Sequence, residues 1–246
     1  MVEKIERVTL NDDGHPRFVD CVIRKSARAK RISLRVASSD RAILTLPKWS
    51  SWSSGFSFLS AEREWLTEKT GNYPSIPSLS EYFSGGGELW LDDSPRTLSW
   101  NRGGDYSKSS CRVGANAVSA CLPGKVGLED ELLETCRSLA KSSLSARLDS
   151  LGQRHDLKWN KLRIGNQRSR WGSCSESGTI SLNWRLILLR YELGNYVLCH
   201  ELAHLEHMNH SVAFWDFLES LVPGAKKMDV ELRELSRAVM GLARNT

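Results

Sequence analysis

Four of the six histidines of this 246-residue chain fall within eleven positions, in the stretch CHELAHLEHMNHSVAFW at residues 199–215. His200 and His204 are four residues apart, so on an α-helix their side chains project from the same face. Apolar residues flank both, and a histidine on a half-buried helix is costly unless its ring nitrogens have partners. Two imidazoles in this arrangement can bind one Zn²⁺. The spacing therefore predicts a metal-binding helix with zinc as the cofactor.

The glutamate of the HELAH pattern has a separate predicted role. Glu201 is rotated by about 100° from His200 around a helix, so it approaches the flank of the metal instead of binding it. A carboxylate there can take a proton from a zinc-bound water, whose pKa the metal lowers to about 7. We therefore predict that Glu201 is the catalytic base.

A third ligand requires the chain to turn after the helix. On a continuous helix His207 would lie about 10.5 Å along the axis from His200, too far for a shared tetrahedral ion. The Met208–Asn209 pair suits a helix end, because asparagine tolerates the left-handed conformation, and Ser211 is a good N-cap for a following helix. This bend predicts His210 as the third ligand.

Two alternatives to this catalytic site stay open at the level of the residues. Glu219, on the following helix, can replace His210 as a carboxylate ligand, as in zinc enzymes with two histidines and one glutamate. The zinc can also be structural, although structural sites are usually rich in cysteine and catalytic sites keep a position open for water.

The rest of the chain predicts an α+β protein. Residues 17–46 and 87–122 contain short apolar runs separated by turns, as expected of strands, and residues 128–151 have helical spacing with acidic residues first. LPGK at 122–125 is the expected boundary between a mostly β N-terminal domain, 1–125, and a catalytic domain, 126–246. We detect no internal repeat.

Composition excludes several classes of protein. The charged N-terminus lacks the apolar segment of a secretory signal, and no run approaches the length of a membrane span. The six cysteines include no CxxC pair, which predicts reduced thiols in a cytoplasmic protein. The net charge of +5 permits an acidic partner without requiring one.

Two stretches before the histidines are candidates for substrate binding. Arg170 and Trp171 of RSRWGSC can line the cleft, with the arginine facing an oxyanion or a carboxylate, although a structural corner explains them equally simply. GTISLNW, which contains Ser181 and Asn183, can offer an exposed strand edge to an extended peptide. Its apolar alternation also fits a strand that packs on the core.

A basic segment near the start has no acidic residue within it: Arg24, Lys25, Arg28, Lys30, Arg31 and Arg35. Such clusters can follow phosphates, and Trp49 and Trp52 nearby can stack on bases. A solvated strand face is the more common explanation, so nucleic acid is a possible partner that we do not favour.

The stretch from RWGSCS through SLNWRL to NHSVAFW resembles the bacterial YgjP-like family of zincin-fold metallopeptidases, relatives of SprT-like and WLM domain proteases. The resemblance is close over residues 162–224 and looser upstream. It implies a zincin-like fold with a small sheet packed on the motif helix. It also implies His200, His204 and His210 as zinc ligands and Glu201 as the base.

We therefore expect a cytoplasmic zinc-dependent metallopeptidase that acts on a peptide or protein and does not associate with membranes. The alternative is a nucleic-acid-associated protein, acting on DNA-bound proteins or carrying a structural zinc. The residues do not separate a peptide from another amide or an ester as the substrate.

Overall fold

The computed structural model describes residues 3–12, 15–72, 76–104 and 108–243. The chain divides into two compact units, Met1–Ser75 and Ile76–Thr246. The division thus falls well before the predicted boundary at residues 125 and 126. The reason is that the strands after residue 87 share a hydrophobic core with the C-terminal helices instead of forming one with the first strands.

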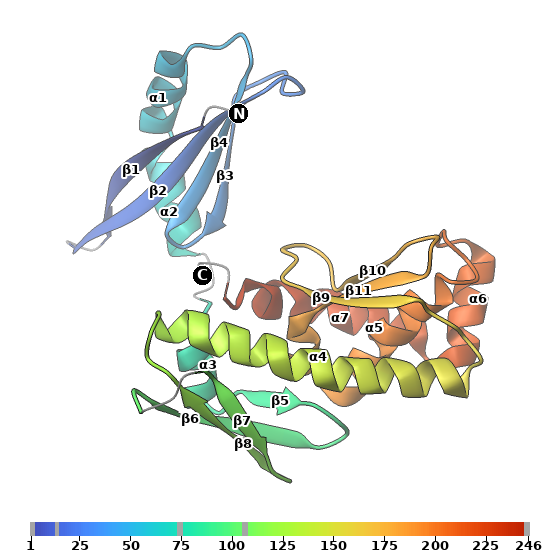
Figure 1. The fold of residues 1–246 in the computed structure, drawn as a ribbon. Coiled ribbons are helices and arrows are strands. Elements are labelled where there is room, and N and C mark those ends of the chain that lie inside the picture. Colours follow the sequence, from blue (N-terminus) through green and yellow to red (C-terminus); the bar gives the residue numbers. More distant parts are fainter. Residues whose placement is uncertain (1–2, 13–14, 73–75, 105–107, 244–246) are drawn as a thin grey trace. The chain divides into compact units, whose positions relative to one another are not determined.

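The first unit is a four-stranded sheet with helices on one face (Figure 1). Its elements are β1 (Glu3–Asp12), β2 (His15–Ser26), β3 (Ser33–Ser38), β4 (Arg41–Pro47), α1 (Trp52–Ala61) and α2 (Arg63–Gly71). The strand order is β1-β2-β4-β3, with β2 and β4 parallel and the outer pairs antiparallel. Alternate residues such as Val19, Cys21 and Ile23 are fully buried against the helices.

The second unit begins with a sheet of the same design. After α3 (Leu79–Ser84) come β5 (Glu88–Trp90), β6 (Pro95–Arg102), β7 (Ser110–Val113) and β8 (Ala117–Leu122). Their order is β5-β6-β8-β7, again with a parallel central pair and antiparallel outer pairs. The chain therefore contains a repeat of topology, contrary to the expectation of no internal repeat. Strand pairing, not a sequence period, carries this repeat.

Helix α4 (Leu128–Arg154) separates this sheet from the C-terminal elements (Figure 1). Those elements are β9 (Lys161–Gly165), β10 (Gly172–Cys174), β11 (Thr179–Asn183), a 3₁₀ turn (Trp184–Leu188), α5 (Tyr191–Ala203), α6 (Val212–Leu221) and α7 (Ala225–Gly241). The apolar residues of α4 join both sides in one core. The predicted α+β class with a strand-rich N-terminal region is confirmed.

The small sheet has the order β10-β11-β9. Strand β11, which is the predicted edge strand GTISLNW, pairs on both sides: antiparallel with β10 and parallel with β9. The prediction of an exposed edge at β11 is therefore wrong. The edge next to α5 belongs to β10, a three-residue strand too short to recognise from its sequence pattern.

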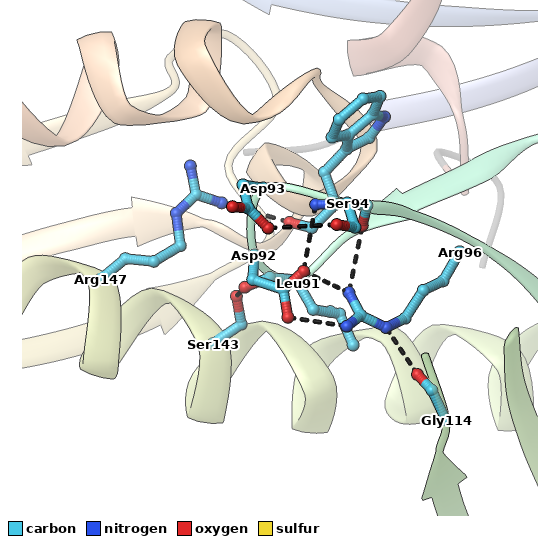
Figure 2. Close-up of polar contacts among 9 residues, drawn as sticks. Leu91, Asp92, Asp93, Ser94, Arg96, Gly114, Ser143 and Arg147 are labelled. Carbon is cyan, nitrogen blue, oxygen red and sulfur yellow. Dashed lines mark hydrogen bonds and ion pairs between the residues drawn. The ribbon is translucent and has the colours of Figure 1, made fainter. Parts of the chain in front are cut away.

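A buried polar network joins α4 to its neighbours (Figure 2). Arg147 of α4 is 6% exposed and donates to the Trp90 carbonyl at 3.2 Å, the Tyr191 carbonyl at 2.9 Å and Asn195 Oδ1 at 2.9 Å. Burial lowers the pKa of its guanidinium to about 10. Because Tyr191 and Asn195 are in α5, one arginine fixes the helix of the histidine motif against α4.

The same network holds the turn between β5 and β6. Arg96 forms a two-point ion pair with Asp92, at 2.5 and 2.7 Å, and its Nε donates to the Gly114 carbonyl at 2.8 Å. Ser143 of α4 donates to the Leu91 carbonyl. The sheet of strands β5 to β8 is therefore tied to the rest of the second unit by polar contacts as well as by the hydrophobic core (Figure 2).

No helix in the described part of the chain has both the length and the apolar character that a membrane crossing needs.

Candidate metal centre

The histidines lie where α5 ends and the chain reverses into α6. Helix α5 ends at Ala203, and His204 is its C-cap. The predicted N-cap is confirmed: the Ser211 hydroxyl accepts from the Phe214 amide. Asn209 does not have the left-handed conformation that we expected of it. Its side-chain oxygen instead accepts from the Ser211 amide at 3.3 Å, so the turn is made by side-chain bonding.

This reversal brings three imidazoles together. One potential ligand atom from each of His200, His204 and His210 lies within 4.8 Å of the other two. The Nε2 atoms of His200 and His210 are 3.0 Å apart although ten residues separate them. Within the described residues, no other histidine, cysteine or acidic group completes such a cluster.

The electrostatics of the cluster favour neutral rings. Burial, together with the neighbouring His204 and His210, lowers the pKa of His200 to about 3. Burial also lowers the pKa of His204, whose Nδ1 lies 3.0 Å from the His207 carbonyl oxygen. Donation to that carbonyl leaves the Nε2 lone pair of His204 free to bind a metal. Neutral, converging imidazoles of this kind fit a divalent transition metal.

Phe214 of α6 packs against all three rings. It is fully buried, and its centroid lies 5.0, 4.7 and 4.7 Å from those of His200, His204 and His210. Trp215 lies 6.3 Å from the His210 ring. These two residues therefore hold the His210 segment against α5.

The alternative ligands lie outside the cluster. The His207 ring packs on Phe217, with a centroid distance of 5.6 Å. Glu219 accepts from the amide of Gly224, the N-cap residue of α7, at 2.6 Å. The structure thus brings His210, and neither of these two residues, next to His200 and His204.

Glu201 is buried beside the histidines, with 5% of its surface exposed. Burial raises the pKa of its carboxyl to about 8, and the charge of Arg170 acts in the opposite direction. The Oε2 atom has no hydrogen-bond partner among the described residues. A buried carboxyl without a partner is costly, so one is expected to serve a function.

Gly172 of β10 makes room for this carboxyl. A Cβ at position 172 would lie 2.5 Å from Glu201 Oε1 and 2.7 Å from its Cγ and Cδ. No local sequence pattern singles out Gly172 for this role. Its motif, RWGSC, marks a tight corner but does not show that the corner faces the glutamate.

The four predicted substrate-binding residues lie in different surroundings. Trp171 is 9% exposed, and its indole donates to Ser236 Oγ at 2.8 Å. Asn183 is fully buried and donates to the carbonyls of Gln167 and Arg170. Both side chains therefore serve the local structure. Arg170 is exposed, and Ser181 is half-buried on the central strand.

A cavity of about 570 Å³ opens beside His204. It is enclosed by the segment 156–160, the turn 175–178 at the end of β10, and the residues that follow α5. Space of this kind next to the histidines can receive a side chain of a bound substrate.

Comparison with known proteins bears on this site. A family model described as the YgjP-like metallopeptidase domain matches residues 30–235. The crystal structure of the metallopeptidase zymogen of Pyrococcus abyssi abylysin shares 29% identity, covering 37% of this chain and 94% of that chain with a TM-score of 0.34. No curated protein matches. Because the family model spans most of the sequence and includes all three clustered histidines, this chain belongs to the YgjP-like metallopeptidase family.

Proposed function

We propose that this metallopeptidase uses zinc, held by His200, His204 and His210, and that Glu201 is its general base. One observation carries the proposal: three imidazoles from two segments converge, and two of them lie on the same helix as a buried carboxyl whose Oε2 has no hydrogen-bond partner among the described residues. The zincin-like fold expected from the resemblance belongs to the same proposal, supported by the packing of β10 and β11 on α5.

Zinc bound here would polarise the scissile carbonyl and lower the pKa of a water molecule. Glu201 would accept a proton at its free Oε2 and later donate it to the leaving amine. The buried position of Glu201 keeps bulk water away from its carboxyl group. The charge of Arg170 favours the ionised form of that group. Gly172 keeps the carboxyl in place by leaving the space that it fills.

An extended peptide would bind along β10, the edge strand of the small sheet that contacts α5. The cavity beside His204 lies at the end of this strand and would receive one side chain of the substrate. Of the four predicted substrate-binding residues, exposed Arg170 is the one that the surroundings support as a contact to substrate.

The test compares wild type with Glu201→Gln in cleavage of an unstructured protein, with metal content measured by mass spectrometry. We expect both proteins to contain zinc and the variant to lose at least about a hundredfold in kcat, the range of a general base. Full activity in the zinc-loaded variant would reject the role of Glu201. Activity only toward small esters would reject the peptidase assignment.

A further inference from the structure

The first unit carries most of the net charge of the chain. Residues 1–75 contain 13 Lys and Arg against 9 Asp and Glu, a balance of +4 within a total of +5. This charge is unevenly placed. From Arg24 to Arg35 there are six basic residues and no acidic one, and all six side chains are exposed or half-buried.

Strand register places part of this charge on one face of the sheet. Because Val19, Cys21 and Ile23 point toward the helices, their neighbours in β2 point the opposite way. The same alternation in β1, β3 and β4 defines what we term the open face of the first sheet. Its cationic and large apolar members are Ile5, Arg7, Phe18, Val22, Arg24, Arg35, Arg41 and Ile43.

The open face combines cations with exposed apolar side chains. Across the four strands, Ile5, Val22, Ile43 and Arg35 form one row, in which Val22 is 6% exposed and Ile43 is half-buried. Ile5 is 70% exposed, and Phe18, on the same face, is 53% exposed. Large apolar side chains such as Ile5 and Phe18 are not expected on a sheet face that contacts only water.

More cations and an aromatic ring project from one end of this sheet. Strands β2 and β4 are parallel, with Ser26 opposite Pro47, so the basic segment 27–32 and Trp49 leave from the same end. Trp49 is 81% exposed. Trp52 is not free in this way, because Lys4 and Lys25 lie 5.0 and 5.1 Å from its ring. Trp49 alone of the two suits base stacking.

Within the described residues, carboxylates do not neutralise these cations, although the ammonium of Lys25 lies over the Trp52 ring. Among the described residues, none of the six from Arg24 to Arg35 has an ion pair with a carboxylate; Arg24 has only a 3.5 Å contact to Thr45 Oγ1. Arg7 is different, because Asp20 lies 2.9 Å from its Nε. The unpaired cations are available to an external anion.

We propose that the open face of the first sheet, together with the basic segment 27–32 and Trp49, binds single-stranded nucleic acid. Arginines and lysines would contact the phosphates, while Phe18, Ile5 and Trp49 would contact unstacked bases. A duplex offers phosphates alone to a flat sheet and leaves the apolar side chains without a partner. This binding activity is independent of the proposed peptidase chemistry.

The second sheet provides an internal control. It has the same topology, and helices likewise cover only one of its faces. Its open face carries Thr97, Ser99, Asn101 and Ser119 with a single arginine, Arg112, and all five are exposed. Arg112 of β7 occupies the edge strand that corresponds to the strand of Arg35. Topology alone therefore does not require arginines and exposed apolar groups on an open face.

The experiment measures fluorescence anisotropy of a labelled oligothymidine, and of a duplex of equal length, with the full chain over a salt series. We expect tighter binding of the single strand. Phe18→Ala and Trp49→Ala should each weaken it by about tenfold, the scale of one stacked base. Arg35→Ala should reduce the slope of log K against log salt by about 0.7, whereas Arg112→Ala should leave the slope unchanged.

Three outcomes would overturn the proposal. The first is no binding of the oligonucleotide at low ionic strength. The second is equal affinity for duplex and single strand, with no effect of Phe18→Ala or Trp49→Ala. The third is displacement of the oligonucleotide by polyglutamate as readily as by unlabelled DNA, which would indicate an acidic protein partner. Binding by the metal-free chain and by Glu201→Gln should match wild type. Failure of the peptidase proposal would therefore leave this test valid.

Discussion

The two four-stranded sheets have the same strand order and directions but different open faces. Their covered faces are alike: Cys21, Ile23 and Leu44 in the first, and Leu98, Val118 and Ala120 in the second, are buried. On the opposite faces, several arginines with isoleucine and phenylalanine contrast with serine, threonine, asparagine and the single arginine Arg112. The comparison teaches that alternate apolar residues determine the sheet, while the residues between them are free to differ in function.

The units also differ in what their charged groups do. In the first unit most cations lie on the surface, whereas in the second unit Arg147 and Glu201 are buried within the elements that carry the histidines. This contrast predicts that substitutions in one unit will leave the activity of the other intact.

The largest effect should come from His210→Ala, which removes one of three converging imidazoles. When protein and zinc are mixed at equal concentrations, we expect the variant to bind less than one zinc ion per chain and to show no detectable peptidase activity. Binding of oligothymidine should stay at the wild-type level. Metal analysis and anisotropy on the same preparation check this. His207→Ala is the matched control, since His207 contacts Phe217 and lies outside the cluster. A parallel loss of both activities would remove the separation between the units.

Next in size is Arg147→Met. Removing the guanidinium leaves the Trp90 and Tyr191 carbonyls and Asn195 without their donor, in a buried place. Each buried acceptor left without a donor costs about 1–3 kcal/mol, so we expect the free energy of unfolding of the second unit to fall by about 3 kcal/mol or more. Urea unfolding, followed by Trp fluorescence and by proteolysis of each unit, should show the transition of the first unit unchanged. A single transition shifted as a whole would show that the two units unfold together.

A smaller effect is expected for Gly172→Ala, which places a methyl group 2.5 Å from Glu201 Oε1. The carboxyl must move, so kcat should fall by about tenfold or more, while zinc content and KM stay close to wild type. Ser173→Ala, on the same strand, is the control and should retain activity. Equal activities of the two variants would show that the carboxyl tolerates displacement.

The smallest effect concerns the first sheet. The guanidinium of Arg7 holds the pKa of Asp20 below its usual value, so the pair contributes to stability above the unfolded pKa and loses this contribution as the pH falls through the folded pKa. Asp20→Asn should therefore lower stability slightly at neutral pH and not at all in strong acid. Thermal unfolding at both pH values checks the sign. A larger effect in acid would contradict it.

Several features of the site were predictable because they depend on residues close together in the chain. The four-residue spacing of His200 and His204 and the N-cap at Ser211 follow from local helix geometry. The predicted bend before His210 is present. Its cause differs from the prediction, because Asn209 accepts a hydrogen bond through its side chain instead of adopting the left-handed conformation.

Local patterns along the chain specify which segments alternate or have helical spacing, and so which residues face a core. The central place of β11, the division of the chain after Ser75, the second occurrence of one topology and the contact of Gly172 with Glu201 emerge only in the folded protein. The physical reason is that periodicity reflects forces within a segment. Strand order and close approach instead depend on pairings between segments far apart in the chain, which no local pattern records.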